Sequence, residues 1–139
     1  MIYVYDVSFI IAIILPDEIN ESVDNIHDAL DENDTVYIPH LTWYEAANIF
    51  RNLVIRKRFS VEEVRHFIPM LTFVDLVTDY VSGINYTTKI WQLSNDYNLT
   101  AYDAAYLELA ERKNAILCTL DIDLLNAAKK HGVRTLETT

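Results

Sequence analysis

Two spacings of apolar residues alternate along the chain. Short runs such as IYVY near the start and AILCTL near residue 117 hold almost no polar side chain, which is typical of strands buried on both faces. Elsewhere apolar residues recur every three or four positions, as from Ile19 through Val23 and Ile26 to Leu30, and this spacing predicts amphipathic helices. The predicted strands are residues 2–5, 35–38, 71–77, 115–120 and 133–136. The predicted helices are residues 8–15, 18–30, 42–57, 60–68, 80–97, 100–113 and 123–131.

Strands that alternate with helices predict an α/β fold, in which helices cover both faces of a parallel sheet through right-handed crossovers. The chain has 139 residues, and we see no internal repeat, low-complexity segment or linker, so we expect a single domain over residues 1–139. Half of the residues are apolar, which argues against a disordered chain.

The composition also indicates where the protein works. The apolar run at residues 7–15 is too short to cross a bilayer, and no lysine or arginine precedes Arg51 to form the basic start of a signal peptide. A single cysteine, Cys118, excludes a disulfide framework and suits a reducing compartment. We therefore expect a cytoplasmic protein without a membrane partner.

One charged residue, Asp6, lies within the first fifteen residues, between Tyr5 and Val7. An ionised carboxylate is costly to bury without partners. Asp6 must therefore cap a local helix or belong to a polar site at the edge of a buried strand. Asp121 likewise ends a predicted strand, and Glu45 and Asp103 lie in the first turns of predicted helices. Because ligands of open α/β sheets bind at the carboxyl ends of the strands, these four acids are predicted to converge on one crevice.

Four converging carboxylates repel one another unless a cation lies between them. Carboxylate oxygens are the hard ligands that Mg²⁺ and Mn²⁺ prefer. A zinc site is not indicated, because the four histidines show no paired spacing and the cysteine stands alone. A metal in such a crevice would polarise a phosphoryl group and activate water. It would also present positive charge to a phosphate in a chain whose net charge is −10.

Helix capping is the competing explanation for these acids. TWYE and TAYD both resemble capping boxes, as does SVEE, for which we expect no function. Asp121 could equally cap the helix that follows it. Tyr102 and Tyr106, which flank Asp103, are interpreted as packing residues, and Thr119 either orients a carboxylate or is structural.

A basic segment stands out in this acidic chain. Residues 51–65 hold five of the eleven basic residues: Arg51, Arg56, Lys57, Arg58 and Arg65. An acidic chain argues against nucleic-acid binding in general. This segment is nevertheless the best candidate to bind a phosphate backbone or an acidic partner, and a solvated helix face is the alternative.

Three stretches of the sequence resemble PIN-domain ribonucleases, and most of all the small VapC-type toxins of type II toxin–antitoxin pairs. They are YDVS, TWYEAANIF and LTAYDAAYLELAERKNAILCTLDIDLLNAAKKHGV. The resemblance covers nearly the whole chain and is strongest over residues 99–133, whereas residues 51–95 match in pattern only. It implies a three-layer α/β/α PIN-like domain with a five-stranded parallel sheet in the order 3-2-1-4-5. It further implies Mg²⁺- or Mn²⁺-dependent cleavage of RNA, a cognate antitoxin and a homodimer.

The resemblance also assigns residues to roles. The four acids of the family correspond to Asp6, Glu45, Asp103 and Asp121, and Ser8 and Thr119 occupy the polar positions beside the first and fourth. Many members carry a basic or neutral residue after the fourth acid, whereas Ile122 and Asp123 follow here. Both Asp121 and Asp123 are therefore candidate metal ligands. We favour Asp121 because it directly ends the strand.

Two other phosphate-handling families fit less well. A haloacid-dehalogenase phosphatase needs a second aspartate where Ser8 stands. A response-regulator receiver needs a second acid beside Asp6. The remaining alternative is a non-catalytic PIN-fold module that binds RNA or serves as a scaffold.

Overall fold

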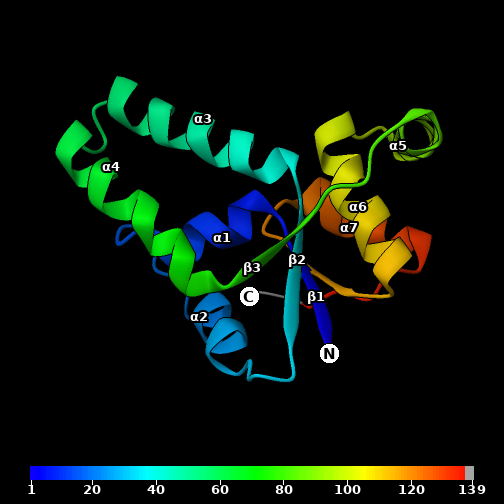
Figure 1. The fold of residues 1–139 in the computed structure, drawn as a ribbon, viewed down its shortest axis with the longest axis horizontal. Helices are drawn as coiled ribbons and strands as arrows, with labels where there is room; N and C mark the ends of the chain where they lie inside the picture. The colour runs from blue at the N-terminus through cyan, green and yellow to red at the C-terminus, as the bar shows by residue number, and fades with distance from the viewer. Residues whose placement is uncertain (137–139) are drawn as a thin grey trace.

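The protein is described from a computed structural model, which covers residues 1–136 (Figure 1). Its strands are β1 (Ile2–Tyr5), β2 (Thr35–Pro39), β3 (Leu76–Asp79) and β4 (Ile116–Cys118). Its α-helices are α1 (Val7–Ile14), α2 (Glu21–Asp28), α3 (Leu41–Ile55), α4 (Val61–Phe67), α5 (Ile84–Tyr97), α6 (Ala101–Lys113) and α7 (Ile122–His131). A 3₁₀ helix, η1, spans Ile68–Val74. Within these residues no helix has the length and apolar character needed to cross a membrane.

The four strands form a parallel sheet in the order β3-β2-β1-β4, which confirms the predicted α/β class and strand order. The predicted fifth strand, residues 133–136, lies in its expected place beside β4. It is reduced to one parallel bridge between Leu117 and Thr135, supported by a hydrogen bond from Leu117 N to the Arg134 carbonyl. The described part of the sheet therefore has four strands instead of five.

The prediction of a strand over residues 71–77 was wrong in most of its length. Pro69 lies at the start of η1, where its fixed φ favours a helical turn. Leu71 and Val74, three residues apart, face the core, while Phe73 is 83% exposed. Asp75 then takes a left-handed φ of 58°, and the strand begins only at Leu76. A short apolar run alone does not distinguish this arrangement from a buried strand.

Alternate strand residues pack into different layers, as the period of two in a strand requires. Val4 and Leu117 belong to a core shared with α5, α6 and α7. Tyr5, Ile116 and Cys118 point to the other face, where α1 and α2 cover the sheet. A third apolar cluster joins α1 to α3 and α4, which project beyond the sheet (Figure 1).

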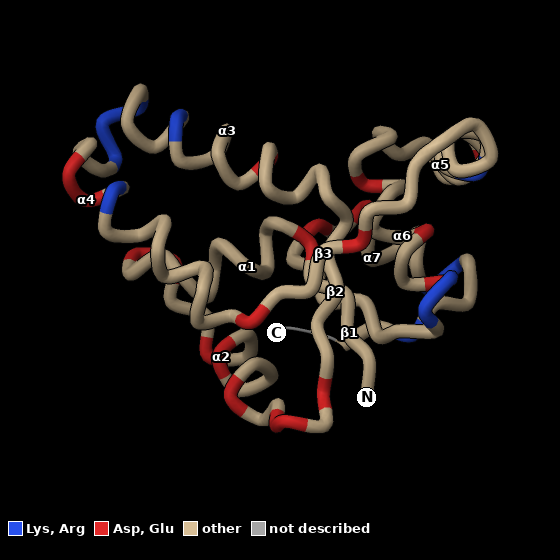
Figure 2. The backbone as a smooth tube through the Cα atoms, in the orientation of Figure 1, with Lys and Arg blue, Asp and Glu red and all other residues tan. Residues whose placement is uncertain are grey.

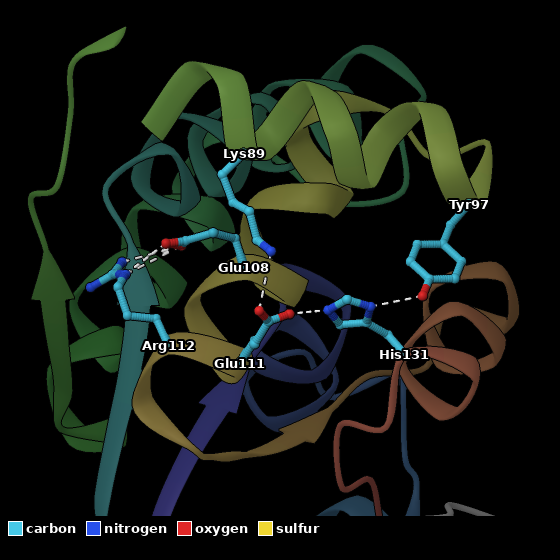
Figure 3. A network of polar contacts seen from close by, with 6 residues as sticks. All are labelled: Lys89, Tyr97, Glu108, Glu111, Arg112 and His131. Atoms are coloured by element: carbon cyan, nitrogen blue, oxygen red, sulfur yellow. Dashed lines mark hydrogen bonds and ion pairs between the residues drawn. The ribbon is translucent and has the colours of Figure 1, made fainter. Parts of the chain in front are cut away.

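Polar contacts tie α6 to its neighbours (Figure 3). His131 of α7 bonds both Tyr97 of α5, at 2.7 Å, and Glu111 of α6, and Glu111 also pairs with Lys89 of α5. Further along α6, Arg112 binds the buried Glu108 and, through both terminal nitrogens, Asp79 at the end of β3. These contacts fix the position of α6, the helix that carries Asp103.

Candidate active site

Asp6 lies at the carboxyl end of β1 and is only 3% exposed. Three donors meet its carboxylate: the Ser8 hydroxyl at 2.6 Å, the Phe9 amide at 3.0 Å and the Thr119 hydroxyl at 2.5 Å. The bond from Phe9 makes Asp6 the N-cap of α1. The two explanations weighed for Asp6 therefore both hold: it caps a helix and it is part of a buried polar cluster.

The Ser8 and Thr119 hydroxyls connect Asp6 to the segment that follows β4. Ser8 Oγ accepts from the Leu120 amide at 3.1 Å, and Thr119 Oγ1 accepts from the Asp121 amide at 2.9 Å. Each hydroxyl thus donates to Asp6 and accepts from the backbone near Asp121. This pair of bridges places Asp121 beside Asp6, although 115 positions separate them in the sequence.

Asp121 is the N-cap of α7. Its Oδ1 accepts from the amides of Asp123 and Leu124 at 2.9 and 3.0 Å. Capping is therefore correct for Asp121, but it occupies only Oδ1. Asp123 lies in the first turn of α7 and is exposed.

Glu45 and Asp103 come from the starts of α3 and α6. The predicted capping box at Glu45 was wrong, because α3 begins at Leu41 and Thr42 already lies inside the helix. Glu45 Oε1 instead accepts a hydrogen bond of 2.6 Å from the Tyr106 hydroxyl. At the start of α6, Thr100 does act as N-cap and accepts from the Asp103 amide at 3.1 Å.

The pKa values show that the acids affect one another. Burial raises the pKa of Asp6 to about 6, although its three hydrogen bonds oppose this rise and the charge of Asp103 adds to it. Burial also raises the pKa of Glu45, which Tyr106 lowers and Asp103 raises. The pKa of Asp103 is raised by burial, then by Asp121 and by Asp123. Asp103 is thus the central acid, within electrostatic reach of all the others.

The donor set fits a hard divalent cation in kind, since it consists of carboxylates whose mutual repulsion a cation would relieve. Over residues 1–136, however, no three acidic, histidine or cysteine side chains lie close enough together to hold an ion as they stand. The oxygens of Asp6 are turned to hydroxyls and an amide, and Oδ1 of Asp121 to two amides. Coordination would require the carboxylates to lie closer together than they do here.

The basic segment lies at the other end of α3 from the acids (Figure 2). Arg56 follows Glu45 by eleven residues, about 16 Å along a helix axis. Arg51, Arg56 and Lys57 are exposed. Arg58 instead binds Asp17 with two nitrogens, both at 2.7 Å, and Glu18 at 3.0 Å. All four predicted RNA-binding residues thus lie on the surface, and Arg58 is engaged in ion pairs there.

Sequence reasoning missed Tyr106, which contacts Glu45, and Thr42, which contacts Tyr106. Tyr106 was interpreted as packing and Thr42 as a helix cap, yet both hydroxyls belong to the chain of bonds that ends on Glu45. A signal was present in the spacing, because Thr42 precedes Glu45 by three residues and Tyr106 follows Asp103 by three. Residues three apart share one face of a helix.

Comparison with known sequences identifies a family. The sequence model of the PIN domain matches residues 3–130, a range that includes all four acids. The chain is 33% identical over 89 residues to a VapC ribonuclease of Mycobacterium bovis and to ribonuclease VapC9 of Mycobacterium tuberculosis. The matched region covers 64% of this chain and 67% of each relative.

Solved structures share the fold. VapBC2 from Rickettsia felis, bound to a DNA fragment from its promoter, superposes with a TM-score of 0.70 at 17% identity and covers both chains completely. FitAcB from Neisseria gonorrhoeae gives a TM-score of 0.69 at 17% identity, covering 99% of this chain and 97% of its own. At such identities the likeness concerns the arrangement of helices and strands.

The raised pKa of Asp6 predicts how its replacement affects stability. A carboxyl whose folded pKa lies above its ordinary value near 3.8 supports folding most below that value, and this support is lost as the pH rises through about 6. The loss is on the order of 2–3 kcal/mol. Asp6→Asn has no such loss and should therefore gain stability relative to wild type between pH 4 and pH 8 in EDTA.

Urea unfolding of both proteins across this pH range measures the effect. The matched control is Asp123→Asn, which removes an exposed charge from the same group of acids and should change the free energy of unfolding less than Asp6→Asn does. A severe loss of stability in Asp6→Asn at pH 8 would mean that Asp6 is purely structural.

Proposed function

The chain belongs to the PIN-domain family, and from this premise we propose that it is a metal-dependent endoribonuclease, the toxin of a type II toxin–antitoxin pair. The proposal is supported by the electrostatic coupling of acids from separate segments: the charge of Asp103 raises the pKa of Asp6 and of Glu45, and the charge of Asp121 raises the pKa of Asp103. The relatives named as VapC ribonucleases support the choice of RNA as substrate.

Asp6, Asp103 and Asp121 would hold the Mg²⁺ or Mn²⁺ ion, with Glu45 and Asp123 as further oxygen donors. When bound, such an ion supplies Lewis acidity toward the phosphodiester and toward water. Between the candidates for the fourth acid we favour Asp121. The amide of Asp121 is joined to Asp6 through Thr119. The charge of Asp121 also raises the pKa of Asp103 more than the charge of Asp123 does.

The residues of the chain perform the remaining tasks. Ser8, Thr119 and the Phe9 amide hold Asp6 at the end of β1. The amino ends of α1 and α7 begin at Asp6 and Asp121, so their positive ends face the place where a phosphate would bind. Glu45, whose pKa is raised by burial, is suited to accept a proton from the attacking water.

Cleavage of total cellular RNA tests the proposed function. Wild type should produce discrete fragments with Mg²⁺ or Mn²⁺ and none in EDTA. Asp6→Asn should be inactive, because it removes a negative ligand and leaves the volume of the side chain unchanged. If wild type binds RNA without cutting it under any of these conditions, the protein is the non-catalytic module instead.

The exposed basic residues are the proposed contacts to the RNA backbone. Each phosphate contact to single-stranded nucleic acid contributes about 0.7 to the slope of log affinity against log salt. Replacing Arg51, Arg56 and Lys57 together by glutamine should therefore reduce the slope by up to about 2, measured by filter binding with the inactive Asp6→Asn protein. Arg58→Gln is the comparison.

Arg58 is held by Asp17 and Glu18, so its replacement should leave the slope near the starting value. An unchanged slope in the triple variant would assign the basic segment to a protein partner or to solvation. A lower slope in Arg58→Gln alone would mean that RNA opens this ion pair.

The antitoxin is proposed to bind beside the acids. A groove of about 570 Å³ runs next to Ser8 and Leu120 and is lined mainly by apolar residues, including Ile11, Ile19 and Ile49. An antitoxin segment would place apolar side chains there and an arginine or lysine among the carboxylates, where charge-assisted hydrogen bonds are strong. The proposal places both proteins in the cytoplasm and the toxin in a homodimer, with a mass near twice 16.1 kDa by light scattering.

Co-expression tests this partner. The chain alone should stop growth, and the product of the neighbouring reading frame should restore growth and block RNA cleavage. Ile19→Asp changes an exposed groove residue and should weaken the complex without reducing cleavage. Normal growth at high expression of the chain alone would contradict the toxin assignment. A complex that is equally stable with Ile19→Asp would contradict the assignment of the groove to the antitoxin.

A further inference from the structure

Tyr106 lies on α6, one turn after Asp103, and its ring is almost completely buried. The side chain is 1% exposed and belongs to the core shared by β1, β4, α5, α6 and α7. Only its hydroxyl reaches polar groups. A phenylalanine would fill the same volume, so packing alone does not account for the hydroxyl.

The hydroxyl takes part in two hydrogen bonds between α6 and α3. It donates to Glu45 Oε1 at 2.6 Å and accepts from the buried Thr42 hydroxyl at 3.0 Å. The direction is determined by chemistry, because an ionised carboxylate has no proton to give. The single phenolic proton therefore goes to Glu45, and Thr42 supplies the proton that the phenolic oxygen accepts.

This chain of bonds holds one oxygen of Glu45. Thr42 and Glu45 lie three residues apart on the same face of α3, so Tyr106 contacts both at once. Within residues 1–136 no other group donates a hydrogen bond to Glu45. Among the described residues, the hydrogen bond that orients this carboxylate thus comes from a rigid side chain in the core.

We propose that Tyr106 is a positioning residue for Glu45: its buried hydroxyl, held by Thr42, fixes Oε1 so that the second carboxylate oxygen remains available to the reacting groups. The inference rests on the proposed function, since it assigns Glu45 a role in the site. It goes further in naming a residue that acts through Glu45 and has no contact of its own with substrate or metal.

The test compares Tyr106→Phe with Tyr97→Phe. Tyr97→Phe also removes an interhelical hydroxyl contact, the one to His131. That contact belongs to the network that joins α5, α6 and α7 (Figure 3). Two quantities are measured for each protein: the affinity for Mn²⁺ by calorimetry, and the rate of RNA cleavage at saturating RNA. Circular dichroism and melting curves monitor the fold.

Tyr106→Phe should remain folded and lose about tenfold or more in Mn²⁺ affinity, in the cleavage rate at saturation, or in both, as is typical when a group that orients a ligand is removed. KM for RNA should stay within about twofold. Tyr97→Phe should match wild type in affinity and rate. Thr42→Val, which removes the donor to Tyr106, should change the same quantities in the same direction by a smaller factor.

A double-mutant cycle separates positioning from general destabilisation. In a Glu45→Gln background, Tyr106→Phe should have little further effect, because the carboxylate it orients is gone. Equal effects of Tyr106→Phe with and without Glu45 would overturn the proposal. So would a Tyr106→Phe protein that matches Tyr97→Phe in both measurements.

The two proposals fail in different ways. If wild type binds Mn²⁺ but cuts no RNA, the proposed function is wrong, and the Mn²⁺ affinities still decide the role of Tyr106. If wild type cuts RNA and Tyr106→Phe matches it in both cleavage rate and Mn²⁺ affinity, only the role of Tyr106 is wrong. If wild type neither binds Mn²⁺ nor cuts RNA, both are wrong.

Discussion

The burial of one carboxylate organises the centre of this protein. Asp6 is enclosed at the end of β1, and a charge in such a place is tolerated only when donors surround it. Those donors come from two distant parts of the chain, the start of α1 and the segment after β4. The hydrogen bonds that the buried Asp6 carboxylate requires therefore fix where α1 begins and how the segment carrying Asp121 lies against β1.

The same bonds explain how helix capping and a candidate catalytic role coexist. A carboxylate at the start of a helix interacts favourably with the amide groups and the positive end of that helix. Asp6 and Asp121 both benefit in this way, yet burial and neighbouring charges still raise the pKa of Asp6 and of Asp103. The caps reduce the cost of gathering negative charge without cancelling it. What remains is the kind of cost that functional sites commonly carry.

Local rules predicted much of this arrangement, and long-range packing decided the rest. The parallel sheet and the place of Asp6 and Asp121 at its carboxyl edge follow from strand patterns, whereas the strand order was implied by the resemblance to PIN domains. The structure of residues 71–77 did not follow from their pattern, because Pro69 and a left-handed Asp75 convert an apolar run into a 3₁₀ turn before β3. The rule that placed Asp103 at this edge does not strictly apply, since α6 follows α5 and not a strand. In Figure 1 α5 is seen nearly end-on while the strands run across the view, so α5 does not carry the chain to the opposite edge of the sheet. The bond from Tyr106 to Glu45 joins residues 61 positions apart; the spacing within each helix shows which residues share a face, but it does not show that the two faces meet.

The acidity of the chain argued against nucleic-acid binding. This argument is weaker once the distribution of the acidic residues is known. Six of the 21 acidic residues lie on α2 and in the connection to β2 (Figure 2), and Asp34 there pairs with the amino group of Met1 at the start of β1. Asp6 is five residues further along, which for a strand corresponds to about 16 Å. The screening length at physiological salt is about 8 Å, so charges at the amino edge of the sheet repel a phosphate at the carboxyl edge only weakly. The carboxylates around Asp103 are the ones that a phosphate would meet, and these are the charges that a divalent cation would neutralise. The local arrangement of charge, and not the net charge of −10, therefore governs whether this surface can accept RNA.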